Sequence, residues 1–277
     1  MTARYDVDAD IARASTLSAA YYRDAAAWDA TLERVFARTW QWLGDLRDVA
    51  APASLAPRTL LPVSLDEPLL LARDASGDWR CLSNVCTHRG NLLVREACRA
   101  DHIRCGYHSR RFDLSGRMTF MPEFDAAKDF PSPADDLPRV AHTDWAGFAF
   151  AALDPAAPFD AFAGDLAASL GAMPVERLAH DPSRDRDYDV AAHWALYVEN
   201  YLEGFHIPFV HRALNDTVDY GSYATTLHAL SSVQVARARD GVDAFVPAHP
   251  GQPAVAAYYR GAFQNLMGNG DPGGLSR

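Results

Sequence analysis

The chain has 277 residues, of which 49% are hydrophobic and 22% are charged, so it can build a large core in one or two domains. Its net charge of −10 argues against nucleic acid or an anionic membrane as a partner. No apolar run approaches a membrane span, the N-terminus lacks the apolar core of a secretory signal, and the four cysteines show no disulfide framework. The sequence therefore predicts a cytoplasmic protein.

A helical pattern at the start of the chain gives way to signs of β-structure. Apolar side chains recur at near-helical intervals within the first 40 residues, at Trp28, Leu32, Val35, Phe36 and Trp40. Residues 68–72 and 79–83 flank the turn-like segment 74–78, which predicts a β-hairpin. Residues 111–116 predict a further strand followed by a turn.

Two short cysteine–histidine motifs lie in this β-rich region. Cys86-Thr-His88 and Cys105-Gly-Tyr-His108 are separated by the 16 residues 89–104, and each motif offers one thiolate and one imidazole. Two cysteines on one iron and two histidines on the other are the ligands of a Rieske-type [2Fe–2S] cluster. The types and spacing of these residues therefore predict a Rieske cluster.

Zinc and chance clustering are the alternatives to this interpretation. Zinc also accepts two cysteines and two histidines, but zinc fingers usually group cysteine with cysteine and histidine with histidine, whereas each motif here is mixed. This difference favours the cluster. The other two cysteines, Cys81 and Cys98, are interpreted as ordinary reduced thiols.

A third polar constellation follows in the second half of the chain. Apolar spacing predicts a helix over residues 195–205, and Pro208 stops it. Because their positions step by three, Asn200, Glu203 and His206 are expected along one face of this helix.

A second histidine, His211, follows the proline break and can fold back toward His206. Two histidines and a carboxylate with open positions form the facial triad of non-haem Fe(II) oxygenases. A lone buried histidine is more often a hydrogen-bonded core residue. With a Rieske motif in the same chain, we interpret the pair as iron ligands.

Residues 81–122, which carry both cysteine–histidine motifs, resemble the Rieske domain of ring-hydroxylating oxygenase alpha subunits, the family that includes choline monooxygenase-like enzymes. Respiratory Rieske proteins carry two further cysteines that form a disulfide. Here these positions hold Asn91 and Tyr107, which points to the oxygenase or ferredoxin type. The resemblance extends over roughly residues 28–275.

The resemblance implies an α+β fold with two metal-binding domains. An all-β Rieske domain is expected over residues 41–155, preceded at 1–40 by a helical segment that packs on the catalytic domain. Residues 156–277 would form a partial catalytic domain of the helix-grip type, an antiparallel sheet on a long helix.

The family also implies a role for each polar residue of the third constellation. His206 and His211 would bind a mononuclear Fe(II), and Asn200 would sit beside it. Glu203 would bridge His206 to a Rieske histidine of a neighbouring subunit, which by its loop position is His108.

By resemblance, the chain is the alpha subunit of a Rieske non-haem iron oxygenase with a [2Fe–2S] cluster and a mononuclear Fe(II). A reductase or ferredoxin would supply electrons, and O₂ would be used to hydroxylate or oxidatively demethylate a small organic substrate. A homotrimer is implied.

One departure from the family pattern concerns the third iron ligand. Relatives supply it as an aspartate far downstream, near a C-terminal helix. No acidic residue after His211 lies in a segment resembling theirs; the acidic residues there are Asp216, Asp219, Asp240, Asp243 and Asp271. We therefore expect the chain to lack the end of its catalytic sheet, near a strand-like segment at 262–267, and to bind iron weakly. The alternative function is a Rieske electron-transfer protein, or an inactive oxygenase without the third ligand.

Overall fold

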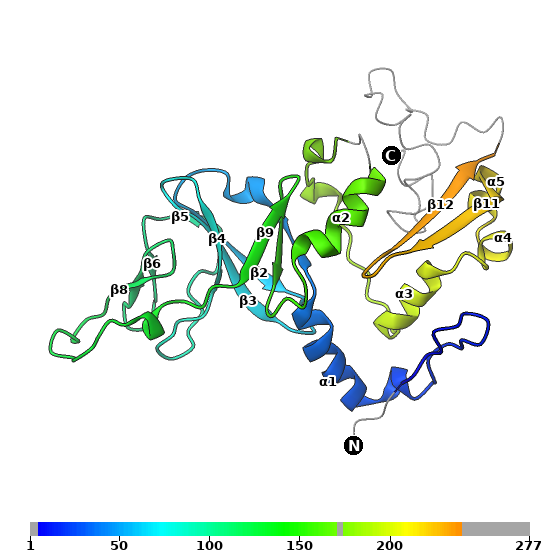
Figure 1. Cartoon of the computed structure of the whole chain (residues 1–277). Coiled ribbons are helices and arrows are strands. Elements are labelled where there is room, and N and C mark those ends of the chain that lie inside the picture. The colour runs from blue at the N-terminus through cyan, green and yellow to red at the C-terminus, as the bar shows by residue number, and fades with distance from the viewer. Residues whose placement is uncertain (1–4, 171–173, 240–277) are drawn as a thin grey trace. The chain divides into compact units, whose positions relative to one another are not determined.

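The structure of the protein, a computed structural model, describes residues 5–170 and 174–239 (Figure 1). The chain falls into two compact units. The first runs to Pro158 and also includes Glu176–Asp181, and the second consists of Phe159–Val175 and the chain from Pro182 onward. Over the described ranges, no helix has the length and apolar character needed to cross a membrane.

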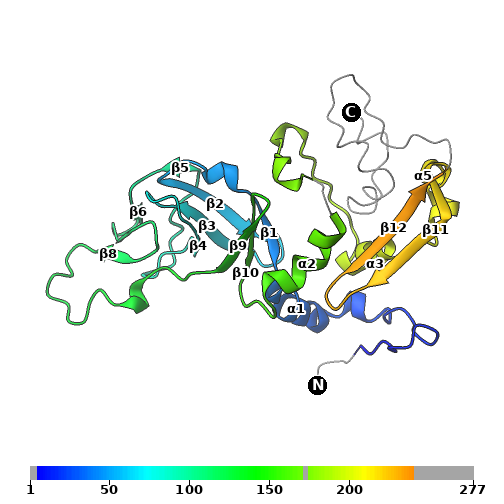
Figure 2. The same ribbon diagram turned by 45° about the horizontal axis from the view of Figure 1, so that its top comes forward.

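The described part of the first unit is built mainly from antiparallel strands (Figures 1 and 2). A four-stranded sheet has the order β4-β3-β2-β5, with strands β2 Ser54–Leu60, β3 Glu67–Arg73, β4 Trp79–Ser83 and β5 Cys98–Arg99. A three-stranded sheet has the order β1-β10-β9, with strands β1 Gln41–Asp45, β9 Ala141–Trp145 and β10 Phe148–Ala152. Another has the order β6-β7-β8, with strands β6 Ile103–Arg104, β7 Arg111–Phe112 and β8 Met118–Phe120.

The helical start of the chain is helix α1, Ala25–Arg34, followed by a 3-10 turn at Phe36–Arg38. The Asp24 side chain caps α1 by accepting a hydrogen bond from the Ala26 amide at 2.9 Å. Trp28 packs edge-on against Phe36, as the helical spacing predicts. This segment groups with the strands of the first unit, and its packing on the catalytic domain stays a prediction.

Strand β3 is buried on both faces, which explains its unbroken apolar run. Its Leu69 and Leu71 belong to a core cluster shared with β1 and β10, while Leu70 and Ala72 belong to a second cluster on the opposite face. Side chains alternate between the two faces of a strand, so one strand serves both cores. The predicted hairpin is present, since β3 pairs with β4 from Leu69 opposite Ser83 to Arg73 opposite Trp79.

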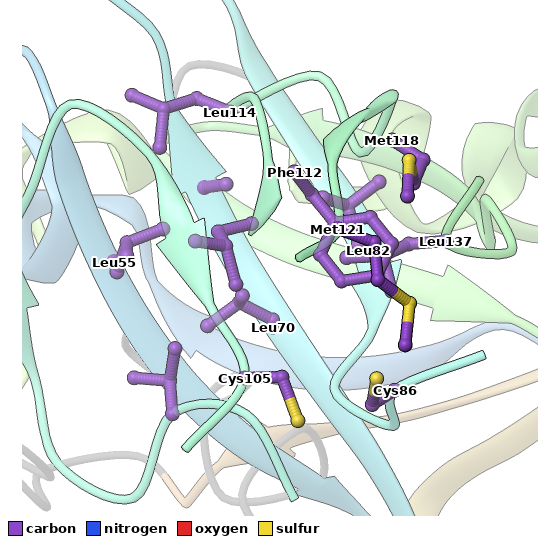
Figure 3. Close-up of a cluster of buried hydrophobic side chains, with 13 residues drawn as sticks. Leu55, Leu70, Leu82, Cys86, Cys105, Phe112, Leu114, Met118, Met121 and Leu137 are labelled. Atoms are coloured by element: carbon purple, nitrogen blue, oxygen red, sulfur yellow. The ribbon is translucent and has the colours of Figure 1, made fainter. Parts of the chain in front are cut away.

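The second core cluster carries the cysteine motifs. Phe112 and Ile103 of the short sheet are fully buried in it beside Leu70 and Leu82. Figure 3 shows Cys86 and Cys105 near each other along one edge of this apolar group. The two loops that carry the cysteine motifs therefore rest on a buried apolar cluster.

The described part of the second unit combines helices with one hairpin (Figure 1). Its elements are α2 Phe159–Leu170, α3 Trp194–Leu202, α4 Ile207–Val210, α5 Arg212–Thr217, β11 Val218–Leu227 and β12 Ser232–Ala238. The helix predicted over residues 195–205 ends at Leu202 instead. The strand expected at 262–267 lies outside the described residues.

Candidate metal centres

The two cysteine motifs occupy loops with the same backbone pattern. One loop follows β4 and the other joins β6 to β7. In each, the cysteine carbonyl accepts from the amide four residues later, Gly90 in the first loop and Ser109 in the second, at 3.0 and 3.1 Å. The cysteine amide donates to the carbonyl five residues later, and this bond measures 2.9 Å in both loops. Equivalent hydrogen bonds thus close both loops.

The matching positions Gly90 and Ser109 both have left-handed backbone, with φ of 69° and 61°. Glycine adopts this conformation freely, whereas a residue with a Cβ is strained in it by about 1–2 kcal/mol. Ser109 therefore holds a conformation that glycine supplies at the equivalent place in the other loop. Arg104 supports it by donating to the Ser109 hydroxyl at 2.9 Å.

The four predicted cluster ligands form two close pairs. The thiols of Cys86 and Cys105 are buried and lie near each other (Figure 3). The rings of His88 and His108 lie with centroids 4.7 Å apart. The structure thus pairs one sulfur donor with the other and one imidazole with the other.

The two thiols differ electrostatically. Burial alone would raise the pKa of Cys105, but amide groups of Tyr107 and His108 donate to its sulfur and hold the pKa below its usual value. Burial raises the pKa of Cys86. Backbone donors aimed at a cysteine sulfur favour the thiolate, the form that binds metal. By contrast, burial raises the pKa of the core thiol Cys81 to about 12.

One buried nitrogen of this site, Nδ1 on His108, lacks a hydrogen-bond partner among the described residues. A buried polar atom without a partner is costly, and coordination to iron would satisfy it. The described residues contain no group of three ligands suited to a single metal ion. A two-iron cluster needs only two protein ligands on each iron, so this donor set fits a Rieske cluster.

Two asparagines make contacts around the cluster loops that the sequence did not predict. The buried Asn84 side chain donates to the Val94 carbonyl and accepts from its amide, at 2.7 and 2.9 Å. Asn91 stands where respiratory Rieske proteins have a disulfide cysteine, and its amide donates to the Cys105 sulfur at 3.7 Å. The only sequence signal for Asn84 is its place at the end of a predicted strand.

The third constellation, which contains Glu203, His206 and His211, is arranged around a break between two helices. Helix α3 ends at Leu202, and Glu203 is its extended C-cap, with φ of −112° and ψ of 145°. The prediction that Asn200, Glu203 and His206 share one helical face is therefore wrong. The Glu203 carboxylate accepts from the Phe205 amide at 2.6 Å and contacts His206 Nδ1 at 2.5 Å, so it makes its contacts from extended backbone.

The two histidines of this site lie together. His206 and His211 have ring centroids 4.9 Å apart, with the rings nearly perpendicular. Glu203 engages His206 Nδ1, whereas His206 Nε2 is buried and unsatisfied among the described residues. A carboxylate on one ring nitrogen is the usual arrangement around a histidine that binds metal through the other. The pair therefore fits a metal ion bound through His206 Nε2.

The β11–β12 hairpin fixes the helix break from one side. The Tyr223 ring packs on Gly204, where an added Cβ would lie 2.8 Å from the tyrosine Cζ. The Tyr223 hydroxyl donates to Gln234 at 2.8 Å, and Gln234 donates to the Leu202 carbonyl at 3.1 Å. Only glycine fits under the ring, so Gly204 allows the hairpin to pack closely on the break between Glu203 and His206.

The remaining candidates lie apart from this pair. Asn200 is exposed in the last turn of α3. Asp216 and Asp219 are also exposed, and neither joins the histidines in a group of three metal ligands within the described ranges. Asp240, Asp243 and Asp271 lie outside the described residues.

Comparison with known proteins identifies the family of the domain that carries the cysteine motifs. Residues 40–131 match the family of Rieske [2Fe–2S] domains, so the first unit contains a Rieske domain, and a [2Fe–2S] cluster is the group such a domain holds.

The whole chain has more specific relatives. It is 28% identical over 235 residues to the carnitine monooxygenase oxygenase subunit of Escherichia coli (strain K12), covering 83% of this chain and 61% of that protein. It is 25% identical over 246 residues to the chloroplastic choline monooxygenase of Arabidopsis thaliana, covering 84% of this chain and 57% of that protein. The chain thus spans about three fifths of the length of these proteins, and over that part it is similar to them in sequence.

A solved structure agrees with the fold. A quaternary ammonium Rieske monooxygenase, described with carnitine oxidation and inter-subunit electron transfer, superposes with a TM-score of 0.64 at 25% identity. The match covers 79% of this chain and 60% of that one. The predicted α+β fold class, with an all-β Rieske domain, is confirmed.

Proposed function

We propose that this chain acts in a Rieske non-haem iron oxygenase as its alpha subunit. The observation that carries the proposal is the presence of two metal-binding constellations in one chain. One consists of the two close pairs of ligands in the cysteine loops, and the other is the pair His206 and His211 with Glu203 on His206 Nδ1. A carrier protein would need only the first.

Each side chain has a role in this proposal. Cys86 and Cys105 bind one iron of the cluster, and His88 and His108 bind the other. The backbone donors at the Cys105 sulfur stabilise negative charge there. When bound, the cluster supplies single electrons, and a mononuclear iron with open positions activates O₂ for insertion into a substrate.

At the second site, His206 and His211 hold the mononuclear Fe(II). Glu203 keeps the Nδ1 proton of His206 in place and thereby directs Nε2 at the metal. The same carboxylate, by family analogy, is the contact for His108 of a neighbouring subunit, and Asn200 lies near the iron. No third protein ligand is assigned in this proposal, because Asp216 and Asp219 do not join the histidines within the described residues and the later aspartates lie outside them.

The partners and substrate follow from the relatives. Carnitine and choline monooxygenases suggest a small quaternary ammonium compound as substrate, with hydroxylation or demethylation as the reaction. A reductase or ferredoxin would reduce the cluster. A homotrimer, with electrons crossing between subunits, and a cytoplasmic location complete the proposal.

A Rieske electron-transfer protein is the second candidate. It is favoured by one observation: within the described residues, no carboxylate completes a three-ligand group with His206 and His211. Such a protein would carry the cluster and exchange electrons but would not consume O₂ with a substrate.

The test uses the full chain reconstituted anaerobically with iron and sulfide. We expect a red-brown protein with a Rieske spectrum, and His108→Cys should change that spectrum because thiolate replaces imidazole. A colourless protein that binds zinc stoichiometrically would refute the cluster.

Substrate-dependent oxidation separates the two candidates. The reduced protein is mixed with O₂ and carnitine or choline, and cluster re-oxidation and product are followed. An oxygenase should lose this reaction in His206→Ala while keeping its cluster, and His142→Ala, remote in sequence from both motifs, should behave as the parent. Cluster re-oxidation without product, equal in all variants, would favour the electron-transfer protein.

A further inference from the structure

Arg110 is a guanidinium buried beside the cluster loops. Its side chain is only 5% exposed, although it lies two residues after His108. It donates to the Thr87 hydroxyl at 2.7 Å and to Asp135 Oδ1 at 3.0 Å, and its Nε faces the Met121 sulfur at 3.4 Å. Its charge also lies 5.6 Å from the centre of the Phe130 ring.

These contacts join the two loops. Thr87 stands between Cys86 and His88 in the first loop, and Arg110 closes the second. The Thr87 hydroxyl accepts from Arg110 and donates to the Asp135 carbonyl at 2.7 Å. Thr87, Arg110 and Asp135 therefore form one network, which we name the loop clamp.

Within the loop clamp, the Arg110 side chain is 5% exposed and the Asp135 side chain is 22% exposed, and both keep their charges. Ser132 donates to Asp135 Oδ2 from its amide and hydroxyl, at 2.9 and 3.0 Å, which leaves Oδ1 for Arg110. These Ser132 bonds, followed by Arg110, hold the pKa of Asp135 below its usual value. Removing a guanidinium from water costs several kcal/mol, and an apolar side chain of similar volume could fill the same space. Packing alone is thus a poor reason for an arginine here.

The Arg110 guanidinium lies next to both ligand pairs. It donates to Thr87, which stands between Cys86 and His88, and it follows His108 by two residues. Its side chain is only 5% exposed, so water screens its charge little. Arg110 therefore places a fixed positive charge close to the predicted cluster ligands.

We propose that Arg110 is a positioning residue that holds the two cluster loops together and raises the reduction potential of the cluster. Reduction adds one electron to the cluster, and a fixed positive charge in a poorly solvated site stabilises the added electron. Asp135 opposes the effect, because its carboxylate partly cancels the guanidinium. This inference rests on the proposed cluster ligands.

The experiment measures the midpoint potential of the cluster in the reconstituted full chain by a spectroscopic redox titration. Arg110→Gln should lower the potential and make the reduced cluster about tenfold less populated at a fixed potential, equivalent to 59 mV for a one-electron couple. Asp135→Asn should raise the potential. The exposed neighbour Arg111, whose guanidinium lies over Phe120, provides the control, because Arg111→Gln should leave it unchanged.

Two further variants separate charge from geometry. Arg110→Lys keeps the charge but not the forked hydrogen bonds, so its potential should stay near that of the parent while its reduced-state EPR lines broaden. Thr87→Val removes both hydroxyl bonds without changing charge, and it should broaden the EPR lines with little change in potential.

The outcomes are distinguishable. If Arg110→Gln and Asp135→Asn shift the potential in the same direction, or if neither shifts it, the inference is wrong. If Arg110→Gln assembles no cluster, the other two variants test the inference. It then requires a raised potential in Asp135→Asn and a potential near that of the parent in Arg110→Lys. If the parent protein itself forms no cluster, the proposed function fails instead.

Discussion

Single residues set the geometry of both candidate metal centres. Ser109 adopts the left-handed backbone that Gly90 adopts in the matching loop, and Glu203 engages one nitrogen of His206 so that the other faces the metal position. In each case a small change of side chain alters a ligand that is one to three residues away.

The strain at Ser109 can be tested with a matched pair. Ser109→Gly should raise the free energy of unfolding by less than about 1 kcal/mol, because relief of about 1–2 kcal/mol is offset by the greater freedom of glycine in the unfolded chain. Gly90→Ala should lower it, since no atom lies within 4 Å of the added Cβ and backbone strain acts alone. Urea unfolding measures both. Changes of equal sign would contradict the equivalence of the loops.

The orienting role of Glu203 predicts a loss in metal affinity. Glu203→Gln keeps an acceptor for the Phe205 amide but removes the negative charge next to His206, so Co(II) affinity should fall about 10- to 100-fold. Absorbance titration with Co(II) measures this, and single-turnover kinetics should slow with the cluster spectrum unchanged. Glu199→Gln, one turn earlier on α3, is the control. Unchanged affinity and rate in Glu203→Gln would remove the role.

At the scale of elements, the break after α3 depends on the hairpin. Gly204→Ala places a Cβ 2.8 Å from the Tyr223 ring, so the hairpin or the break must shift, at about 1–3 kcal/mol. Gly164→Ala in α2 has no atom within 4 Å of the new Cβ and should stabilise by about 0.5–1 kcal/mol. Thermal unfolding compares the two. Tyr223→Leu should partly rescue Gly204→Ala, and failure to rescue would mean that the ring is not the obstacle.

The elements also show what sequence patterns can and cannot predict. The β3–β4 hairpin follows from apolar runs around a turn, since both signals are local. Helix α3 was predicted to run through Glu203 because the first helix-stopping residue in the sequence is Pro208, but the helix ends at Leu202. The Tyr223 ring that packs on Gly204 comes from a distant hairpin, and no local pattern records it. Likewise, the motif spacing predicted the four cluster ligands. The sequence around Arg110 and Arg111, by contrast, does not indicate that the first arginine is buried and the second exposed.

At the scale of the whole molecule, hydrogen-bonded carboxylates tie stability to pH. The side chain of Asp45 is 4% exposed. Burial alone would raise its pKa, but hydrogen bonds from Arg47 and the His180 amide hold the pKa below its usual value. The pKa of Asp135 is also held below its usual value. A lowered folded-state pKa contributes stability that is complete above the unfolded value of about 3.9 and is lost as pH falls through the folded value.

We therefore expect the free energy of unfolding to fall steeply with acid below about pH 4. Denaturant unfolding followed by circular dichroism from pH 6 to pH 3 measures the slope. Asp45→Asn should flatten the curve and lower stability at pH 6, whereas the exposed Asp125→Asn should change neither. A parent curve that is flat between pH 5 and pH 3 would contradict the assignment.

The paired hydrogen bonds of the two cysteine loops have a consequence for assembly. In both loops the cysteine amide and carbonyl find their partners within the loop, so no metal is needed to close the backbone. In a zinc finger, by contrast, the chain folds around the ion. We therefore expect the two loops to keep their backbone form without iron, so that iron shortage would lower the fraction of loaded protein more than the amount of folded protein.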